Sequence, residues 1–355
     1  MNLAKKLTAV LLVAAMIFAF SACSLTEDDS EILDIGTINI GVILSGDIDD
    51  GSTLSNKIYG AFTSACNSAG AGDSQINEQT KIKPGDTAAM EKAMADIIAR
   101  GCRLIVGTDS GYYAEFEKYA KSNTNIFFVL LTDYDAADSD IENLTVFHMN
   151  TFESDYILGS MAAQSSANGK IGYVADADSA VSKADVNAFL LGAQSINPSA
   201  TVSLVSVEDA ENGYPTAVKA LTDAGCDVLY TKNYEIGEGD EKESYFVAPD
   251  SVANERCLVK LVDSKPEFVS AAHINYETAF TKIVTDTVNE KYAELTGYSA
   301  GVKDGAVDVR PADDAKLNEK ADQIKNDLYK GNNILGDKNV KDLCASYLNG
   351  ITELY

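Results

Sequence analysis

The chain has 355 residues, of which 46% are hydrophobic, and a formal charge of −26 from 28 basic and 54 acidic side chains. This acidic balance argues against a nucleic-acid partner, because phosphate backbones are neutralised by lysine and arginine. It would also hold the body of the protein away from anionic lipid headgroups. The length is enough for two packed lobes, since single hydrophobic cores stop growing at about 250 to 300 residues.

The first 23 residues have the pattern of a secretory signal. Two lysines precede an apolar run at residues 7–20, which is too short to span a bilayer comfortably, and Ser-Ala-Cys follows it. This ending resembles the bacterial lipobox, in which the cysteine becomes diacylated and N-terminal. We expect residues 1–22 to be a lipoprotein signal peptide, Cys23 to carry the lipid, and residues 23–36 to form an acidic tether. An ordinary signal peptide with an unmodified cysteine is the alternative.

The stretch after the tether predicts a first strand and its ligand loop. Residues 38–44 are a short apolar run rich in β-branched side chains, and an acidic loop with glycines follows at residues 45–52. Helical spacing then starts at Leu54, which is typical of the opening βα unit of a parallel sheet. Ligands of such sheets lie beyond the carboxyl ends of the strands. The candidates here are Asp49, Asp50, Ser52 and Asn56.

Two further strands of the first lobe end in polar and aromatic residues. The apolar run at residues 102–106 precedes Asp109 and Tyr112, and the run at residues 126–131 precedes Asp133 and Tyr134. Parallel strands share one carboxyl edge, so we expect these side chains to gather there.

A weak internal repeat indicates a second lobe of the same architecture. Residues 93–108 and 217–232 align without gaps, and both read as helix, Gly-Cys, apolar strand and polar exit. A helix through residues 156–163 begins this lobe, and its Gly159 permits close packing. The predicted strands are residues 170–174, 202–207, 228–230, 245–248, 258–262 and 268–272, and the polar residues after them are Asp176, Asn233, Tyr234, Asp250 and His273.

Several of these stretches resemble the basic membrane protein (BMP) family of substrate-binding lipoproteins. The most specific is the Glu-x-x-Tyr-x-x-Gly-x-x-Ala-Ala run at residues 153–163, followed closely by Gly-Lys-Ile-Gly at residues 169–172; residues 39–42 and 50–60 add to it. The resemblance covers nearly the whole mature chain. It implies an α/β type I periplasmic-binding-protein fold, with two doubly wound parallel-sheet lobes joined by a three-crossover hinge. We expect lobe 1 at residues 37–148 plus 274–297, and lobe 2 at residues 149–273 plus 298–355.

The resemblance also implies a purine nucleoside ligand, with aromatic rings stacked on the base and acidic and amide side chains bonding base and ribose. The family pattern Asp-Lys-Ser-Phe-Asn falls on residues 50–54, so Thr53 and Leu54 stand where the family has its stacking Phe and polar Asn. Asp250 falls on the family's ribose-binding Asp, and His273 falls near its ligand Lys.

The residues at the strand ends suit such a ligand independently of the family. Carboxylates accept charge-assisted hydrogen bonds from hydroxyl and N–H groups, at about 1.5 to 3 kcal/mol each, and tyrosine faces stack on planar rings. An aspartate after a strand is also a common helix N-cap, and a tyrosine is often a core residue. The predicted ligand-binding set is Asp49, Asp50, Ser52, Asn56, Asp109, Tyr112, Asp133, Tyr134, Asp176, Asn233, Tyr234, Asp250 and His273.

Other chemistries lack their motifs. The acidic loop has no complete EF-hand pattern, His148 and His273 stand far apart, and five scattered cysteines beyond Cys23 suggest buried thiols. No GxSxG elbow or P-loop occurs, although a catalytic carboxylate pair stays open. We expect neither cofactor, metal nor enzyme activity. The predicted function is a lipid-anchored solute-binding protein on the extracytoplasmic face of the cell membrane, with an ABC permease as partner; the alternatives are a surface sensor or regulatory lipoprotein, and another solute class such as a sugar.

Overall fold

The computed structural model describes residues 34–49, 53–132, 139–177, 179–208, 213–237, 242–249, 255–288 and 297–354. The predicted signal peptide, the lipidated Cys23 and most of the tether lie outside these ranges. The same holds for five members of the predicted ligand-binding set, which are Asp50, Ser52, Asp133, Tyr134 and Asp250.

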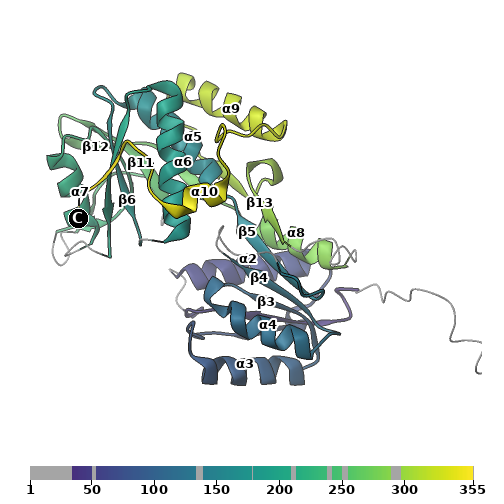
Figure 1. Ribbon diagram of the computed structural model, residues 1–355. Coiled ribbons are helices and arrows are strands. Elements are labelled where there is room, and N and C mark those ends of the chain that lie inside the picture. The colour runs from purple at the N-terminus through teal and green to yellow at the C-terminus, as the bar shows by residue number, and fades with distance from the viewer. Residues whose placement is uncertain are drawn as a thin grey trace, which may run out of the picture.

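The first lobe is a six-stranded sheet with helices on both faces, the lower lobe in Figure 1. All of its neighbouring strands pair in parallel, in the order β13-β5-β4-β3-β1-β2. The strands are β1 (Asn39–Ile43), β2 (Ile76–Gln79), β3 (Cys102–Gly107), β4 (Phe127–Leu131), β5 (Leu144–Met149) and β13 (Gly297–Ala300). The helices are α2 (Leu54–Ser68), α3 (Thr87–Ala99), α4 (Tyr113–Ser122) and α8 (Tyr276–Val288), with 3₁₀ turns η1 (Asp73–Gln75) and η2 (Ser110–Tyr112).

The second lobe is a seven-stranded sheet in the order β14-β12-β11-β8-β6-β7-β15. Its strands are β6 (Lys170–Ala175), β7 (Thr201–Ser206), β8 (Val228–Lys232), β11 (Arg256–Val262), β12 (Lys265–Ile274), β14 (Val307–Val309) and β15 (Ile351–Glu353). Its helices are α5 (Thr151–Ser165), α6 (Ala180–Ile196), α7 (Tyr214–Asp223), α9 (Ala315–Tyr329) and α10 (Val340–Ala345), with the 3₁₀ turn η6 (Val302–Asp304). The predicted α/β class with two helix-covered sheets is confirmed.

Lobe 2 is not parallel throughout, because β11 and β12 form an antiparallel hairpin. Only Asp263 and Ser264 join the two strands, and both have positive φ, at 49° and 65°. Two central residues with positive φ are typical of a type I′ hairpin turn, and a parallel connection needs a far longer crossover. β11 also pairs antiparallel with β8, and β14 with β12.

The predicted strand at residues 245–248 is wrong. The structure has instead a two-stranded ribbon of β9 (Glu235–Ile236) and β10 (Glu243–Ser244) just before it. Residues 245–248 follow this ribbon without strand pairing, and the Asn233 amide donates to the carbonyl of Phe246 at 3.0 Å. The segment is therefore held by a side chain rather than by a sheet.

The internal repeat corresponds to equivalent elements of the two lobes, α3 with β3 and α7 with β8. Each helix ends at a glycine in the left-handed region, Gly101 with φ 74° and Gly225 with φ 85°. Only glycine adopts this conformation without a Cβ penalty, which explains why Gly-Cys recurs at the start of each strand.

Helices α5 and α6 cross at a pair of glycines. A Cβ atom on Gly159 would lie 1.9 Å from the carbonyl oxygen of Phe189, and a Cβ atom on Gly192 would lie 1.9 Å from that of Tyr156. The predicted close packing at Gly159 is therefore confirmed, and it is reciprocal.

The chain passes between the two sheets three times, always after the carboxyl end of a strand. β5 leads into α5 at Asn150, β12 leads into α8 at Asn275, and β13 leads into η6 at Gly301. Figure 1 shows β5, β13 and α8 at the junction of the lobes. The carboxyl edges of both sheets therefore lie toward this junction.

The five cysteines in the described residues are free and buried, as predicted: Cys66, Cys102, Cys226, Cys257 and Cys344. None of the helices in the described part of the chain combines the length and the hydropathy that crossing a membrane requires.

Candidate functional site

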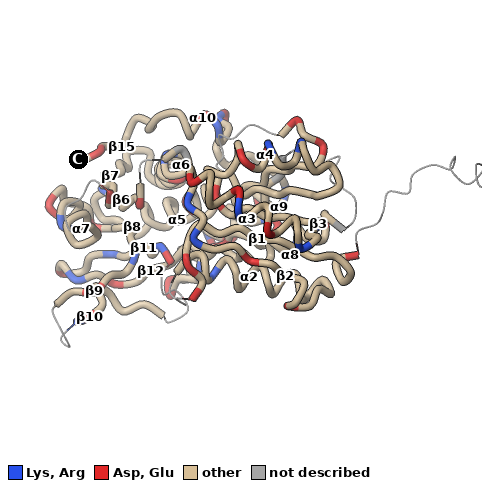
Figure 2. Tube along the Cα trace, turned by 90° about the horizontal axis from the view of Figure 1, so that it is seen from below, with Lys and Arg blue, Asp and Glu red and all other residues tan. Residues whose placement is uncertain are grey.

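The carboxyl edge of lobe 2 gathers charged side chains from four strands. Asp176 directly follows β6, and Lys232 ends β8. Because β11 runs antiparallel, its first residue, Arg256, pairs with Lys232. The next hairpin strand then returns His273 to the same edge, beside Glu255. Figure 2 shows both charge signs along β11 and β12.

Asp176 is held by three donors. Its Oδ2 accepts from Arg256 Nη2 and from Lys232 Nζ, both at 3.0 Å, and its Oδ1 accepts from the Tyr214 hydroxyl. Burial alone would raise the pKa of Asp176, but Arg256, Tyr214 and Lys232 together hold that pKa well below its usual range. The carboxylate is thus ionised at every physiological pH, and its side chain stays 46% exposed.

Arg256 connects this edge to the interior of lobe 2. Its Nη1 donates to the Tyr173 hydroxyl at 2.7 Å, which in turn donates to Asp155 Oδ1 at 2.8 Å. The guanidinium carbon also lies 5.3 Å from the Tyr173 ring centroid and 5.9 Å from that of Tyr230, within cation–π range. Burial raises the pKa of Asp155 to about 6, and the Arg256 charge opposes that rise.

Glu255, His273 and Arg310 form a second cluster beside the first. His273 Nδ1 lies 3.0 Å from Glu255 Oε1, and Arg310 Nη2 lies 2.9 Å from the same ring nitrogen. Arg310 Nη2 also contacts Glu255 Oε1 at 3.3 Å. Glu255 is buried, so the arginine beside it compensates its charge.

Three tyrosine rings stack next to Asp176. Tyr234 lies between Tyr214 and Tyr245, with ring centroids 6.4 Å and 4.8 Å away and interplanar angles of 19° and 10°. Asn233 Oδ1 accepts from the backbone N–H of Tyr234 and of Phe246, which fixes the loop that carries the stack. Within its described contacts, Asn233 therefore positions the aromatic residues.

The lobe 1 edge is formed by loops and helix caps. Asp49 is exposed, and its N–H donates to Asp47 Oδ1 at 3.1 Å; Asp47 pairs with Lys81 at 2.8 Å. Asn56 is half-buried in the first turn of α2, and its amide donates to the carbonyl of Ile48. The amide of Asn56 thereby fastens the acidic loop to the helix.

Two predicted site residues of lobe 1 have structural roles. The Asp109 carboxylate accepts from the N–H of Gly111 at 3.0 Å, so it caps η2. Tyr112 is only 1% exposed, stacks on Phe116, and donates its hydroxyl to the carbonyl of Ile82. We leave both out of the site proposed below.

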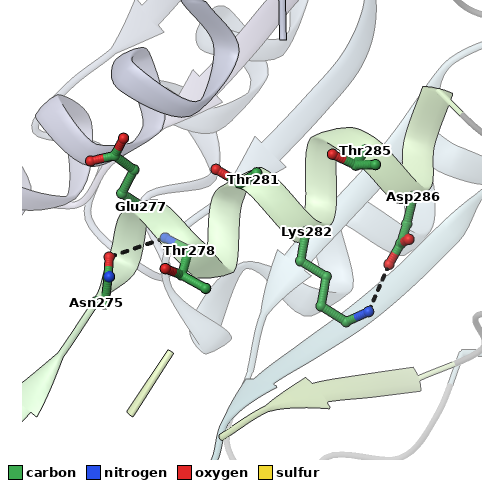
Figure 3. Close-up of a pocket in the computed structure, with 7 residues that line it drawn as sticks. All are labelled: Asn275, Glu277, Thr278, Thr281, Lys282, Thr285 and Asp286. Carbon is green, nitrogen blue, oxygen red and sulfur yellow. Dashed lines mark hydrogen bonds and ion pairs between the residues drawn. The ribbon is translucent and has the colours of Figure 1, made fainter. Parts of the chain in front are cut away.

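A depression of about 620 Å³ runs along α8, close to the junction of the lobes (Figure 3). Its lining is polar throughout: Asn275, Glu277, Thr278, Thr281, Lys282, Thr285 and Asp286. Lys282 and Asp286 pair with each other at 3.0 Å, and Asn275 caps α8 by accepting from the N–H of Thr278. Ligand pockets are mostly apolar with a few polar groups, so we do not assign the ligand to this depression.

The arrangement at the lobe 2 edge suits binding rather than metal chemistry. Among the described residues, no three His, Cys, Asp or Glu side chains form a group that could hold a metal ion. The sequence predicted that Asp176, Tyr234 and His273 lie at this edge, where the structure has them, but it did not predict Arg256, Glu255 or Arg310 there. In the sequence each of these three is only a charged residue next to a strand. Its position at the carboxyl edge follows only from the antiparallel pairing of β11 and β14.

Comparisons with known proteins bear on the family and on the fold. The family described as ABC transporter substrate-binding protein PnrA-like (Bmp) matches residues 37–343, which confirms the resemblance found in the sequence. A purine-binding protein of Brucella abortus is 31% identical over 141 residues, 39% of each chain. A putative ABC transporter glucose-binding protein of Haloferax volcanii is 33% identical over 129 residues, 36% of this chain and 32% of the relative. The matches therefore span about a third to two fifths of these relatives' lengths.

Solved structures share the fold at low identity. A solute-binding protein of an ABC transporter system from Conexibacter woesei superposes with a TM-score of 0.57 at 14% identity, covering 83% of this chain and 97% of that one. A transcriptional activator of the comK gene from Bacillus halodurans superposes with a TM-score of 0.56 at 14% identity, covering 84% of this chain and 99% of that one. At this identity the likeness shows the type I periplasmic-binding-protein fold alone.

Proposed function

Because the chain belongs to the Bmp family of PnrA-like ABC transporter substrate-binding proteins, we propose that it is lipid-anchored through Cys23 on the extracytoplasmic face of the membrane and binds a purine nucleoside. The two lobes close on the ligand and present the closed form to a permease. Such a protein needs only a difference in ligand affinity between its open and closed states.

The observation that carries this proposal is the ionised Asp176 beside the tyrosine stack. A carboxylate has about four lone-pair positions, and three donors occupy Asp176. One position is left for a ribose hydroxyl or a base N–H, and the half-exposed side chain leaves room for it. Tyr234 is covered on both faces by Tyr214 and Tyr245, so the base would stack on the outer face of one of these two rings, in place of the aromatic residue that the first loop lacks.

The ligand would meet groups from both lobes. We propose Asp176, His273 and the tyrosine stack centred on Tyr234 as its lobe 2 contacts, and Asp49 and Asn56 as its lobe 1 contacts. Asp50, Ser52, Asp133, Tyr134 and Asp250, which fall outside the described residues, complete the proposed set. Closure would strip water from these groups, which strengthens their hydrogen bonds. The purine-binding relative supports this ligand class.

We expect guanosine or adenosine to bind in isothermal titration calorimetry, and Asp176→Asn to weaken that binding at least about tenfold. The reason is the loss of a charge-assisted hydrogen bond, worth about 1.5 to 3 kcal/mol. Asp223→Asn is the matched control, because Asp223 is an exposed lobe 2 carboxylate that pairs only with Lys219 among its described contacts. If titration with glucose releases heat of binding and titration with nucleosides does not, the ligand is a sugar, the class named for the putative glucose-binding relative.

The lipid anchor is tested by the intact mass of the mature chain extracted from membranes. The expected species begins at Cys23 and carries the mass of the diacyl group. A chain that begins at Ser24, or at an unmodified Cys23, would remove the anchor from the proposal and leave ligand binding untouched.

A further inference from the structure

Glu153 opens the most specific stretch of the family motif, yet it lies away from the charged edge described above. It sits in the first turn of α5 and is only 9% exposed. Its Oε2 accepts from the backbone N–H of Val302 at 2.6 Å, and its Oε1 accepts from the Asn150 amide at 3.3 Å. A buried carboxylate with two such donors connects two segments that are 149 residues apart.

Those two segments are the first and third crossovers between the lobes. They are joined further by the N–H of Asn150, which donates to the carbonyl of Ala300 at 2.9 Å, and by the Asn150 amide, which donates to Ser299 Oγ at 3.2 Å. Glu153 and Asn150, which also bond to each other, thus form a small network with three contacts from the first crossover to the third.

The second crossover reaches the same point through backbone bonds. The N–H of Asn275 donates to the carbonyl of Ala306 at 2.8 Å, and the N–H of Ala306 donates to the carbonyl of Gly301 at 3.1 Å. Gly301, in the third crossover, is thus linked to the second crossover through Ala306 and lies beside Glu153 of the first. Its φ of −135° is open to any residue, but a Cβ atom there would lie 2.4 Å from Glu153 Oε2. An alanine at this position would therefore have to displace the Glu153 carboxylate.

We propose that Glu153 is a positioning residue for ligand binding, which holds the three crossovers in one arrangement and so brings the two carboxyl edges face to face. Its two carboxylate oxygens accept one hydrogen bond from each of the first and third crossovers. Without it, the hinge would sample more lobe orientations, and the ligand would bind only the competent fraction. The test of this proposal by ligand affinity rests on the proposed function, whereas the test by the distance between the lobes does not.

The conformational test measures the distance between the lobes in the ligand-free protein. Spin labels are placed at Ser122→Cys on α4 and Asp223→Cys on α7, both exposed, in a Cys23→Ser background; the other five cysteines are buried. We expect the distribution of label-to-label distances, measured by double electron–electron resonance, to be about twice as wide in Glu153→Ala as in the wild type. Glu115→Ala is the control, because Glu115 is also acidic in the first turn of a helix but lies on α4, away from the crossovers.

The ligand readout uses guanosine as the probe. Its affinity should fall about tenfold in Glu153→Ala and about threefold in Glu153→Gln, since glutamine has one acceptor oxygen for two donors. Gly301→Ala should widen the distance distribution and lower the affinity for guanosine as Glu153→Ala does, because its methyl group displaces the same carboxylate. In the double variant, the alanine methyl meets no carboxylate, so Gly301→Ala should add nothing to Glu153→Ala.

The outcomes separate the two proposals. A lower melting temperature with an unchanged distance distribution would make Glu153 merely structural and overturn the inference. Additive effects in the double variant would show that the two residues act separately, which also overturns it. If guanosine fails to bind the wild type, the proposed function fails, while the distance measurement still decides the role of Glu153.

Discussion

Gly159→Ala is expected to destabilise lobe 2 by about 3 kcal/mol, because a methyl group there overpacks the crossing of α5 and α6. The added Cβ would meet the carbonyl oxygen of Phe189 at 1.9 Å, well inside the contact distance. Both partners are helix backbone, so neither can turn aside as a side chain would. The helices must separate instead, which opens the core that α5 and α6 share.

Thermal unfolding followed by circular dichroism measures this effect. A loss of about 3 kcal/mol corresponds to a fall in melting temperature of about 6 to 12 °C for a lobe of this size. Gly60→Ala is the control, because Gly60 lies within α2 and no heavy atom lies within 4 Å of the Cβ position. Alanine should stabilise that helix by up to about 1 kcal/mol. Equal melting temperatures for the two variants would show that α5 and α6 are less tightly packed than described.

The fold could be predicted because its signals are local. The repeat around Gly101 and Gly225 marks the same helix end in both lobes, and the apolar runs after these glycines are strands as expected. β2 was not predicted, since only Ile76 of its four residues is apolar and the strand is specified by pairing with β1 at the sheet edge. The hairpin of β11 and β12 was also not recognised as antiparallel, because its turn residues, Asp263 and Ser264, lack the usual glycine.

The candidate site was only half visible in the sequence, because ion pairing is a property of the folded edge. Asp176 follows a strand and was placed correctly at the edge. Its cation Arg256 lies 80 residues later, at the start of an antiparallel strand, where periodicity gives no sign of the partner. Asp109 shows the converse, since it follows a strand in the same way but caps a 3₁₀ turn. The position of an aspartate after a strand therefore predicts that it lies at the carboxyl edge of the sheet, but not whether it binds a ligand or caps a helix.

Arg256→Leu is expected to cost about 1.5 to 3 kcal/mol at neutral pH, because it removes charge-assisted hydrogen bonds to Asp176 and to the Tyr173 hydroxyl that bonds the buried Asp155. Asp176 would lose one of its three donors, and the Tyr173 hydroxyl, which donates to Asp155, would lose the guanidinium beside it. Arg100→Leu is the matched control. Its pair with Asp96 has a similar length of 2.9 Å but is 57% and 43% exposed, so the expected loss is below about 1 kcal/mol.

The loss in Arg256→Leu should depend on pH, and its sign follows from the two carboxylates. Asp155 has a raised pKa, so its burial is most unfavourable above about pH 6 and is relieved as the pH falls and it takes up a proton. Asp176 has a lowered pKa, so its pairing stabilises the wild type above about pH 4, the ordinary value for aspartate, and is lost as the pH falls further. The Asp155 effect therefore makes the difference between wild type and variant larger at pH 7.5 than at pH 5, whereas the Asp176 effect is the same at both values and falls only below about pH 4.

Urea unfolding at pH 7.5 and pH 5 measures this dependence, and a second substitution tests its cause. Asp155→Asn in the Arg256→Leu background removes the uncompensated charge while keeping an acceptor for the Tyr173 hydroxyl, so it should recover part of the stability at pH 7.5 and little at pH 5. A deficit that is the same at both values of pH, and that Asp155→Asn does not reduce, would mean that Arg256 stabilises lobe 2 through its pair with Asp176 and its packing on Tyr173 and Tyr230. The compensation of the buried Asp155 charge would then have no part in the stability that Arg256 gives to lobe 2.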